Sequence, residues 1–140
     1  MMPVLKKSLL LLFAVAVVFT ATILPFFLAN DFGLINLDDY WYVATHDPII
    51  KGMNFEGIKF AFTDLGESIW MPLTWLSYMF DHSLFGFGNW GAFHLHSIIL
   101  HSINACLVFL LLLKISGKIS DERILKRVIV CVIGTLIWSV

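Results

Sequence analysis

The chain has 140 residues, of which 59% are apolar, 15% aromatic and only 14% charged. Soluble domains average about 45–50% apolar and about 25% charged residues, so this composition excludes an ordinary water-soluble domain and an intrinsically disordered chain. The net charge of −1 offers no basic surface for nucleic acid, and two cysteines, Cys106 and Cys131, are too few for a disulfide scaffold.

The first long apolar segment runs from Ser8 to Ala29 without a charged residue. As an α-helix it would be about 33 Å long, which matches a hydrocarbon core of about 30 Å. Lys6 and Lys7 precede it, as they would in a cleaved signal peptide, but the run is longer than the about 7–15 residues expected there. The pattern therefore predicts a cytoplasmic N-terminus at residues 1–7 and an uncleaved transmembrane helix at 8–29.

Residues 30–91 form a long connection that is too aromatic to be disordered, because it holds fourteen of the chain's 21 aromatic residues. Asp47 before Pro48 is typical of an N-cap and first helical residue, and Gly52 would end that short helix. A second helix is indicated by apolar residues at helical spacing, Phe55, Ile58 and Phe62. A third is expected from about residue 72 to 85, with a face toward lipid or the bundle made of Leu73, Leu76, Phe80 and Leu84.

Two further apolar runs follow, at residues 92–113 and 128–140. The first is long enough to span, whereas the second gives only about 20 Å of helix, so we expect a third span that is truncated. Residues 30–91 hold eight acidic and two basic residues, while seven of the nine basic residues lie at the N-terminus or in 114–127. This positive-inside pattern predicts an all-α integral membrane protein with 30–91 outside and 114–127 a basic cytoplasmic loop.

Asp38 and Asp39 are adjacent carboxylates a few residues beyond the first predicted span. One interpretation is a pair of solvated loop carboxylates. The other is a functional site, because aromatic faces next to the pair can stack on a sugar ring and exclude water, and like charges side by side raise one pKa. Adjacent side chains diverge, so we expect one base and one orienting group or metal ligand. The aromatic candidates for substrate binding are Tyr40, Trp41, Tyr42 and Trp70, of which the last also suits an interfacial anchor.

The second predicted span carries a polar stripe at helical spacing, made of His94, Ser97, His101 and Asn104. Hydrogen bonding to other helices and direct contact with substrate are its two interpretations. His96 is expected to point elsewhere. No two histidines have the spacing of a helical zinc site, so no metal site is expected in this span.

Three stretches in order resemble a known pattern: LDDYWYVATHDPII, IKFAFTDLGESIWMPLTWLSYMFDHSLFG and FHLHSIILHSINACLVF. They resemble the amino-terminal membrane region of polytopic GT-C glycosyltransferases, particularly the protein O-mannosyltransferase-like type that carries tetratricopeptide repeats. Members transfer a sugar from a polyprenyl-phosphate carrier to a protein or glycan acceptor on the outer or lumenal face.

The resemblance implies that Asp38 is the catalytic base and that Asp39 orients the acceptor or helps bind a divalent cation. It also implies a multi-pass protein of a bacterial inner membrane or the endoplasmic reticulum, whose partners are the bilayer, the donor, the acceptor and the remaining transmembrane helices of a longer chain. Two positions depart from the pattern: Met71 stands where members often have His, and Ser97 where Asn is common.

Two other classes of function remain open. In a non-catalytic membrane assembly or scaffold protein, the loop helices and the polar stripe would serve packing. In a transporter, histidines within the membrane would relay protons, although the second span has no carboxylate and no broken-helix Gly/Pro pair. Removing the acidic pair distinguishes the enzyme, which should lose turnover and keep its fold, from the scaffold, which should keep its partners.

Overall fold

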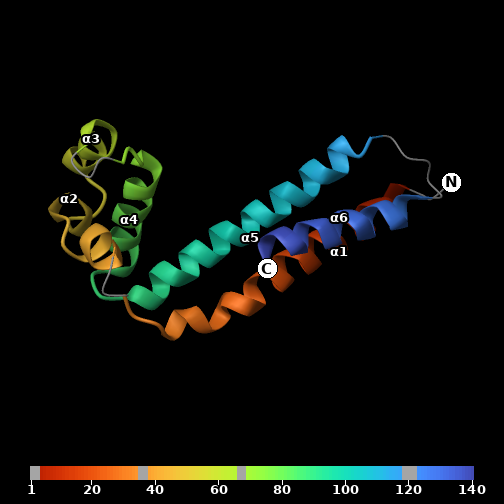
Figure 1. Ribbon diagram of the computed structural model, residues 1–140, viewed down its shortest axis with the longest axis horizontal. Helices are drawn as coiled ribbons and strands as arrows, with labels where there is room; N and C mark the ends of the chain where they lie inside the picture. Colours follow the sequence, from red (N-terminus) through yellow and green to blue (C-terminus); the bar gives the residue numbers. More distant parts are fainter. Residues whose placement is uncertain (1–3, 35–37, 66–68, 118–122) are drawn as a thin grey trace. The chain divides into compact units, whose positions relative to one another are not determined.

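The computed structural model describes residues 4–34, 38–65, 69–117 and 123–140, and all regular elements in these ranges are helical (Figure 1). The chain divides into two compact units. Unit 1 comprises residues 1–28 and 97–140, and unit 2 comprises residues 29–96. The predicted all-α class is therefore confirmed for the described residues.

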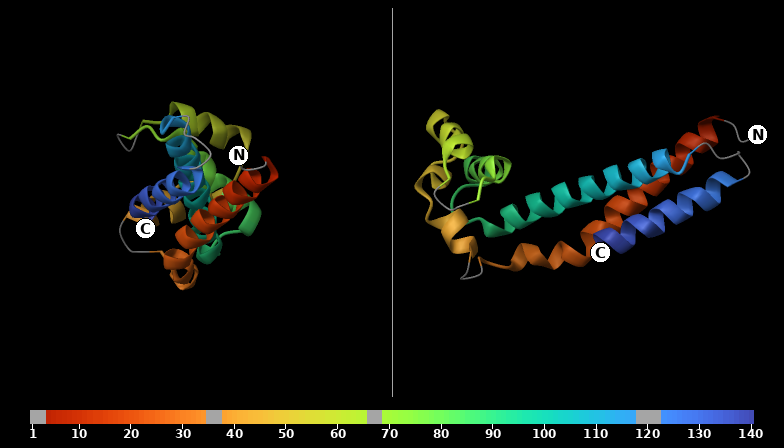
Figure 2. Two further views of the ribbon diagram at one scale, coloured as in Figure 1. Left: turned by 90° about the vertical axis from the view of Figure 1, so that its right-hand side faces the viewer. Right: turned by 45° about the horizontal axis from the view of Figure 1, so that its top comes forward.

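Unit 1 is built from three helices: α1 (Val4–Ile23), the part of α5 (Trp90–Ile115) that follows His96, and α6 (Ile124–Ser139). Helices α1 and α6 lie side by side in Figures 1 and 2. Small side chains let apolar helices approach closely, and larger ones fill the space that remains between them. The buried apolar core of unit 1 combines both kinds and contains Ala14, Val18, Ala105, Phe109, Val128 and Cys131.

The apolar run predicted as one helix over residues 8–29 is not a single α-helix. It ends as α-helix at Ile23 and continues as the 3-10 helix η1 (Leu24–Asp31). Pro25 explains the change, because proline lacks the backbone N–H and its ring clashes with the carbonyl one turn earlier. The helical stretch Val4–Asp31 still has 28 residues, and its most apolar window has a mean hydropathy of 2.6.

Within the described residues, two helical stretches are long and apolar enough to cross a membrane: Val4–Asp31 and α5, which has 26 residues and a most apolar window with a mean hydropathy of 2.3. Helix α6 has 16 residues, about 24 Å of helix, which is less than the hydrocarbon thickness. It packs against α1 and shares the core of unit 1.

Unit 2 consists of short helices gathered on α4 (Pro72–Phe85). Helices α2 (Asp47–Ile50) and α3 (Phe55–Thr63) both pack against α4, and the π-helix η2 (Tyr40–Ala44) packs against α2. Ile49, Ala61, Trp75 and Met79 form its buried apolar cluster.

Helices lie at all three positions predicted within unit 2, but two details differ from the prediction. The N-cap of α2 is His46, in extended backbone, and Asp47 lies inside the first turn, where its carboxylate accepts from Lys51 Nζ at 2.6 Å. The buried side of α3 is Gly57 and Ala61, whereas the apolar residues that revealed the helix are exposed. Hydrophobic periodicity located the helix and could not tell which face packs on protein.

Candidate functional site

Asp38 and Asp39 lie in helical backbone that leads directly into η2. Successive residues on a helix are about 100° apart around its axis, so the two carboxylates point in different directions. Asp38 is exposed and Asp39 is half-buried. The neighbouring acids therefore have different surroundings, one open to solvent and one turned toward protein.

The half-buried acid lies close to a tyrosine of α4. Burial raises the pKa of the Tyr78 hydroxyl, and the negative charges of Asp39 and Asp81 raise it further. The Tyr78 phenol is thereby kept neutral, and it can donate one hydrogen bond. The structure thus brings Asp39, Tyr78 and Asp81 into one electrostatic group, which we call the acidic site.

Aromatic rings support the acidic site from one side. Trp75, which is 1% exposed, lies with its ring centroid 5.5 Å from that of Tyr42 and 6.4 Å from that of Tyr78. The His46 ring stacks on the Trp75 ring, with their centroids 5.4 Å apart. Because Trp75 is fixed in the core of unit 2, it sets the positions of both tyrosines.

A close polar contact in unit 2 joins α4 to the first turns of α5. Asp81, which is 2% exposed, places Oδ1 2.5 Å from Nδ1 of His96. Burial raises the pKa of the Asp81 carboxyl, although the neighbouring His96 and His82 act in the opposite direction.

The next residue along α4 is also buried and also paired. His82 Nε2 lies 3.0 Å from the carbonyl oxygen of Val43, which can only accept, so Nε2 carries the proton. The His82 ring packs between Phe87 and Phe93, with centroids 5.7 and 4.9 Å away. This bond fixes the end of η2, and with it the segment that carries the acidic pair.

Only some of the residues predicted for the site come together. Tyr42 joins the acidic site, while Tyr40 and Trp41 are 51% and 67% exposed. Trp70 is 60% exposed, and its indole Nε1 donates to the carbonyl of Phe62 at 3.2 Å on α3. Its observed contact is with α3, so its role in binding substrate stays a prediction.

The polar stripe of α5 is only partly packed within the described residues. His101 Nε2 lies 3.0 Å from the carbonyl of Ser139 on α6, and its ring contacts Phe26 and Trp138. His94 is half-buried, whereas Ser97 and Asn104 are exposed. The face of α5 that is buried in unit 1 is instead made of Ile98, Ser102, Ala105 and Phe109.

The donor set for a divalent cation is incomplete. Over the described ranges, no three His, Cys, Asp or Glu side chains are grouped so that they could hold a metal ion. Asp38 and Asp39 diverge on their helix and gain no third ligand of these types. The cation therefore remains a prediction of the resemblance.

Sequence reasoning missed Tyr78, Asp81 and His96 as members of one site. Tyr78 and Asp81 are three residues apart on α4, and that spacing puts them on one helical face. His96 was expected to point away from the functional stripe, which it does, because it faces Asp81 instead. The available signal was an acid inside an apolar helical pattern, which needs a partner when it is buried.

Comparisons with protein-family models, with curated proteins and with solved structures find no match for this chain. The fold and site therefore define a class only: a helical protein with two stretches that could cross a membrane and a helical unit that carries the acidic site.

Proposed function

We propose that this chain forms the amino-terminal membrane part of a glycosyltransferase. The full-length enzyme transfers a hexose from a polyprenyl-phosphate carrier to a protein or glycan acceptor at the extracytoplasmic face of a bacterial inner membrane or the endoplasmic reticulum. The proposal rests on the resemblance to GT-C enzymes, and three structural observations support it.

The first observation concerns the surface of the two long helical stretches. Only 17% of the most apolar window of Val4–Asp31 and 22% of that of α5 are buried within the chain. A core helix of a soluble protein would be mostly buried, whereas lipid-facing helices leave their apolar side chains on the surface. These exposures support insertion of both stretches in a bilayer, with α6 as a third membrane helix alongside α1.

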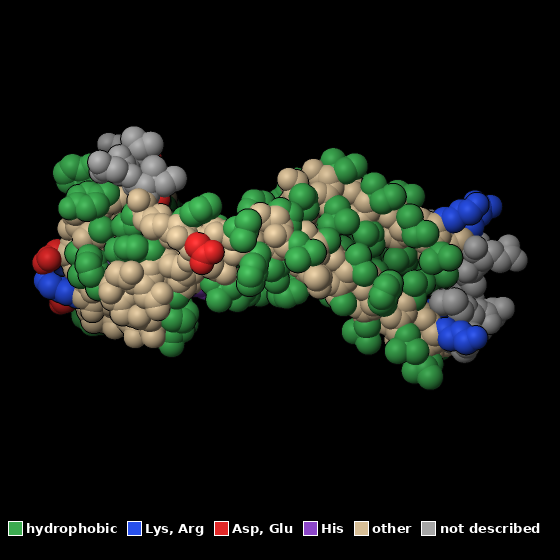
Figure 3. Space-filling model, turned by 90° about the horizontal axis from the view of Figure 1, so that it is seen from below, with side chains coloured by type: hydrophobic (Ala, Val, Ile, Leu, Met, Phe, Trp, Pro, Cys, Tyr) green, Lys and Arg blue, Asp and Glu red, His purple; other side chains and the backbone are tan. Residues whose placement is uncertain are grey.

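The second observation is the position of basic residues in unit 1. α1 begins, α5 ends and α6 begins at one end of unit 1 (Figure 1), where Figure 3 shows lysine and arginine side chains. Basic residues at one end of a helical bundle favour that end on the cytoplasmic side. Unit 2 would then lie outside, where polyprenyl-phosphate sugars are used by such enzymes.

The third observation, which carries the assignment of the base, is the difference between the two adjacent acids. Asp38 is exposed, so an acceptor hydroxyl can reach its carboxylate, while Asp39 is half-buried beside Tyr78. We assign Asp38 as the general base that takes the acceptor proton as the hydroxyl oxygen attacks the sugar. Asp39 holds the acceptor in line, and Tyr42 and Trp75 limit water at this side of the site.

The departing carrier phosphate needs a positive group, as phosphoryl leaving groups do. In the described part of unit 2 the lysines are Lys51, which pairs with Asp47, and Lys59, which is exposed on α3. Neither belongs to the acidic site. We therefore assign this role to the further part of the enzyme that the resemblance implies.

The test is transfer of mannose or glucose from polyprenyl-phosphate to acceptor peptides and glycans by the purified full-length protein. Asp38→Asn keeps the shape and removes the basic oxygen, so its rate should fall by about 10² to 10⁴. Asp39→Asn should act mainly by raising the KM for the acceptor, and less by lowering the rate. Asp31→Asn, an exposed acid of the same unit, is the control and should keep the wild-type rate. Wild-type turnover by Asp38→Asn would refute the assignment, and retained partner binding without any transfer would favour a scaffold.

A further inference from the structure

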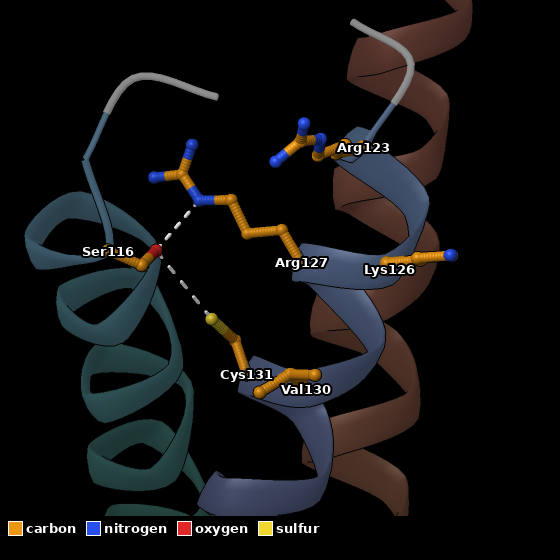
Figure 4. A pocket seen from close by; sticks show the side chains of 6 residues that line it. All are labelled: Ser116, Arg123, Lys126, Arg127, Val130 and Cys131. Atoms are coloured by element: carbon orange, nitrogen blue, oxygen red, sulfur yellow. Dashed lines mark hydrogen bonds between the residues drawn. The ribbon is translucent and has the colours of Figure 1, made fainter. Parts of the chain in front are cut away.

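A pocket in unit 1 lies between the end of α5 and the first turns of α6 (Figure 4). Its volume is about 270 Å³. The pocket is apart from the acidic site, since all its lining residues belong to unit 1. They are Ser116, Arg123, Lys126, Arg127, Val130 and Cys131.

Two arginines reach over the space between the helices. Arg127 Nε donates to Ser116 Oγ at 2.7 Å, and Ser116 Oγ donates to the carbonyl of Leu113 at 3.0 Å. This chain of bonds holds the Arg127 guanidinium across the gap. Figure 4 shows the Arg123 guanidinium turned toward the same space and the Lys126 ammonium turned away from it.

Neither guanidinium is neutralised by a carboxylate of the described residues. Two positive groups on one side of a small pocket repel each other, and an anion between them removes that repulsion. Guanidinium groups bind phosphate oxygens through paired hydrogen bonds, which favours phosphate among anions.

The wall of the pocket along α6 is apolar. Val130 and Cys131 lie one to two turns along α6 from the arginines, and Val130 is 67% exposed. Cavities that enclose a whole drug-sized ligand measure about 300–1,000 Å³, so this smaller pocket fits a headgroup whose chains lie outside. A positive rim above an apolar wall matches a phosphate ester on a hydrocarbon chain.

We propose that this pocket binds the phosphate of an anionic phospholipid from the leaflet at the basic end of unit 1. The inference rests on the membrane insertion proposed above and not on sugar transfer. Basic pockets between membrane helices on the cytoplasmic side commonly hold anionic headgroups, at about 1 kcal/mol for each Lys or Arg near the surface. Two arginines therefore give about a 30-fold preference for an anionic over a zwitterionic lipid.

The test measures lipids retained by the purified full-length protein in native mass spectrometry. Phosphatidylglycerol and phosphatidylcholine compete in mixed micelles, with inorganic phosphate as a further arm. Arg123→Gln with Arg127→Gln should reduce the preference for phosphatidylglycerol by about 30-fold. The matched control, Lys6→Gln with Lys114→Gln, removes two charges from exposed lysines that do not line the pocket and should keep the preference.

Equal losses in both double variants would overturn the proposal, because the preference would then come from overall charge. Displacement of phosphatidylglycerol by inorganic phosphate would also overturn it and assign the pocket to a soluble anion. Resistance of each variant to extraction from membranes by carbonate is measured on the same samples. A chain that is extracted refutes membrane insertion, while a retained chain without lipid preference refutes only the pocket. Sugar transfer is assayed separately, so a failure of the proposed enzyme activity is distinguished from a failure of membrane insertion and from a failure of lipid binding in the pocket.

Discussion

The surroundings of the Asp81 carboxyl differ from those of a solvated side chain. It is buried, it contacts His96, and its pKa is raised by burial. When the folded-state pKa of an acid is raised, the folded protein binds more protons than the unfolded chain over the interval between the two values. Stability is then greatest below the unfolded pKa and falls as the pH rises through the folded pKa.

We expect this pH dependence to disappear when the acid is replaced. In Asp81→Asn the buried group no longer ionises, so the fall in stability above about pH 4, the ordinary aspartate pKa, should flatten. The measurement is the helix unfolding temperature of the protein in mild detergent across a pH series. Asp31→Asn, which replaces an exposed acid of the same unit, should keep the wild-type profile. An unchanged slope in Asp81→Asn would show that burial of this carboxyl does not govern stability.

The two histidines of α5 lead to a second prediction. His96→Leu leaves the buried Asp81 without its imidazole, which should cost about 1–3 kcal/mol, the penalty for an unsatisfied buried polar group. His101→Leu loses one hydrogen bond to the Ser139 carbonyl, and such bonds between membrane helices are worth about 0.6 kcal/mol. His96→Leu should therefore be the more destabilising change in detergent unfolding. The stripe pattern alone predicts the opposite order, and that order would refute the importance of the Asp81 pair.

At the scale of the elements, glycine at position 52 decides how closely α2 and α4 approach. Its φ of 72° ends α2, and a Cβ there would lie 2.5 Å from Ser83 Oγ and 3.4 Å from Ser83 N. Ser83 Oγ also accepts the backbone N–H of Met53 at 2.6 Å. The left-handed turn at Gly52 and the hydrogen bond from Met53 to Ser83 of α4 are thus coupled. A larger residue at position 52 disturbs both.

Gly52→Ala should reduce the free energy of unfolding by about 1–2 kcal/mol for the left-handed backbone, and further for the contact with Ser83. Gly88→Ala is the control, because its φ of 89° is also positive and a Cβ there would meet nothing within 4 Å. The difference between the two variants measures the approach of α2 to α4. Equal unfolding free energies would mean that Ser83 moves aside without cost.

The positions of the helices could be predicted from the sequence, and their buried faces could not. Pro72 and the apolar spacing after it located α4, which ends at Phe85 as expected. Leu73 and Leu84, two of the four residues predicted to face lipid or the bundle, are 76% and 60% exposed, while Trp75 and Met79 form the core. In a chain with apolar residues on every side, periodicity does not separate a protein-facing from a lipid-facing side.

Of the carboxylates of the candidate site, only the adjacent Asp38 and Asp39 could be predicted from the sequence. Asp38 and Asp39 stood out because adjacent carboxylates are conspicuous among aromatic residues. Tyr78 and Asp81 became visible only when α4 was placed beside η2, because that contact joins segments about forty residues apart in the chain. The π-helix η2, which directly follows both acids, has no sequence signal of its own.

At the scale of the whole molecule, charge separates the two units. Six of the described basic residues belong to unit 1, and unit 2 holds most of the acids. The helices of unit 1 leave their apolar side chains largely exposed, so water would be a poor solvent for them. The insertion of unit 1 in a bilayer, as proposed above, would account for these exposed apolar side chains.

The last prediction tests this arrangement by labelling single cysteines in sealed vesicles. Cys106 and Cys131 are first replaced by Ala, and one cysteine is introduced either as Thr63→Cys, at the exposed end of α3, or as Gly117→Cys, where a Cβ meets nothing within 4 Å. A membrane-impermeant maleimide should reach position 63 only from the extracytoplasmic side and position 117 only from the cytoplasmic side, because the basic residues around α6 resist translocation. Labelling of both positions from one side would mean that α5 does not span. If each position were labelled only from the side opposite to the one expected, the topology would be the inverse of the one proposed. The acidic site would then lie in the compartment where the proposed acceptor is absent.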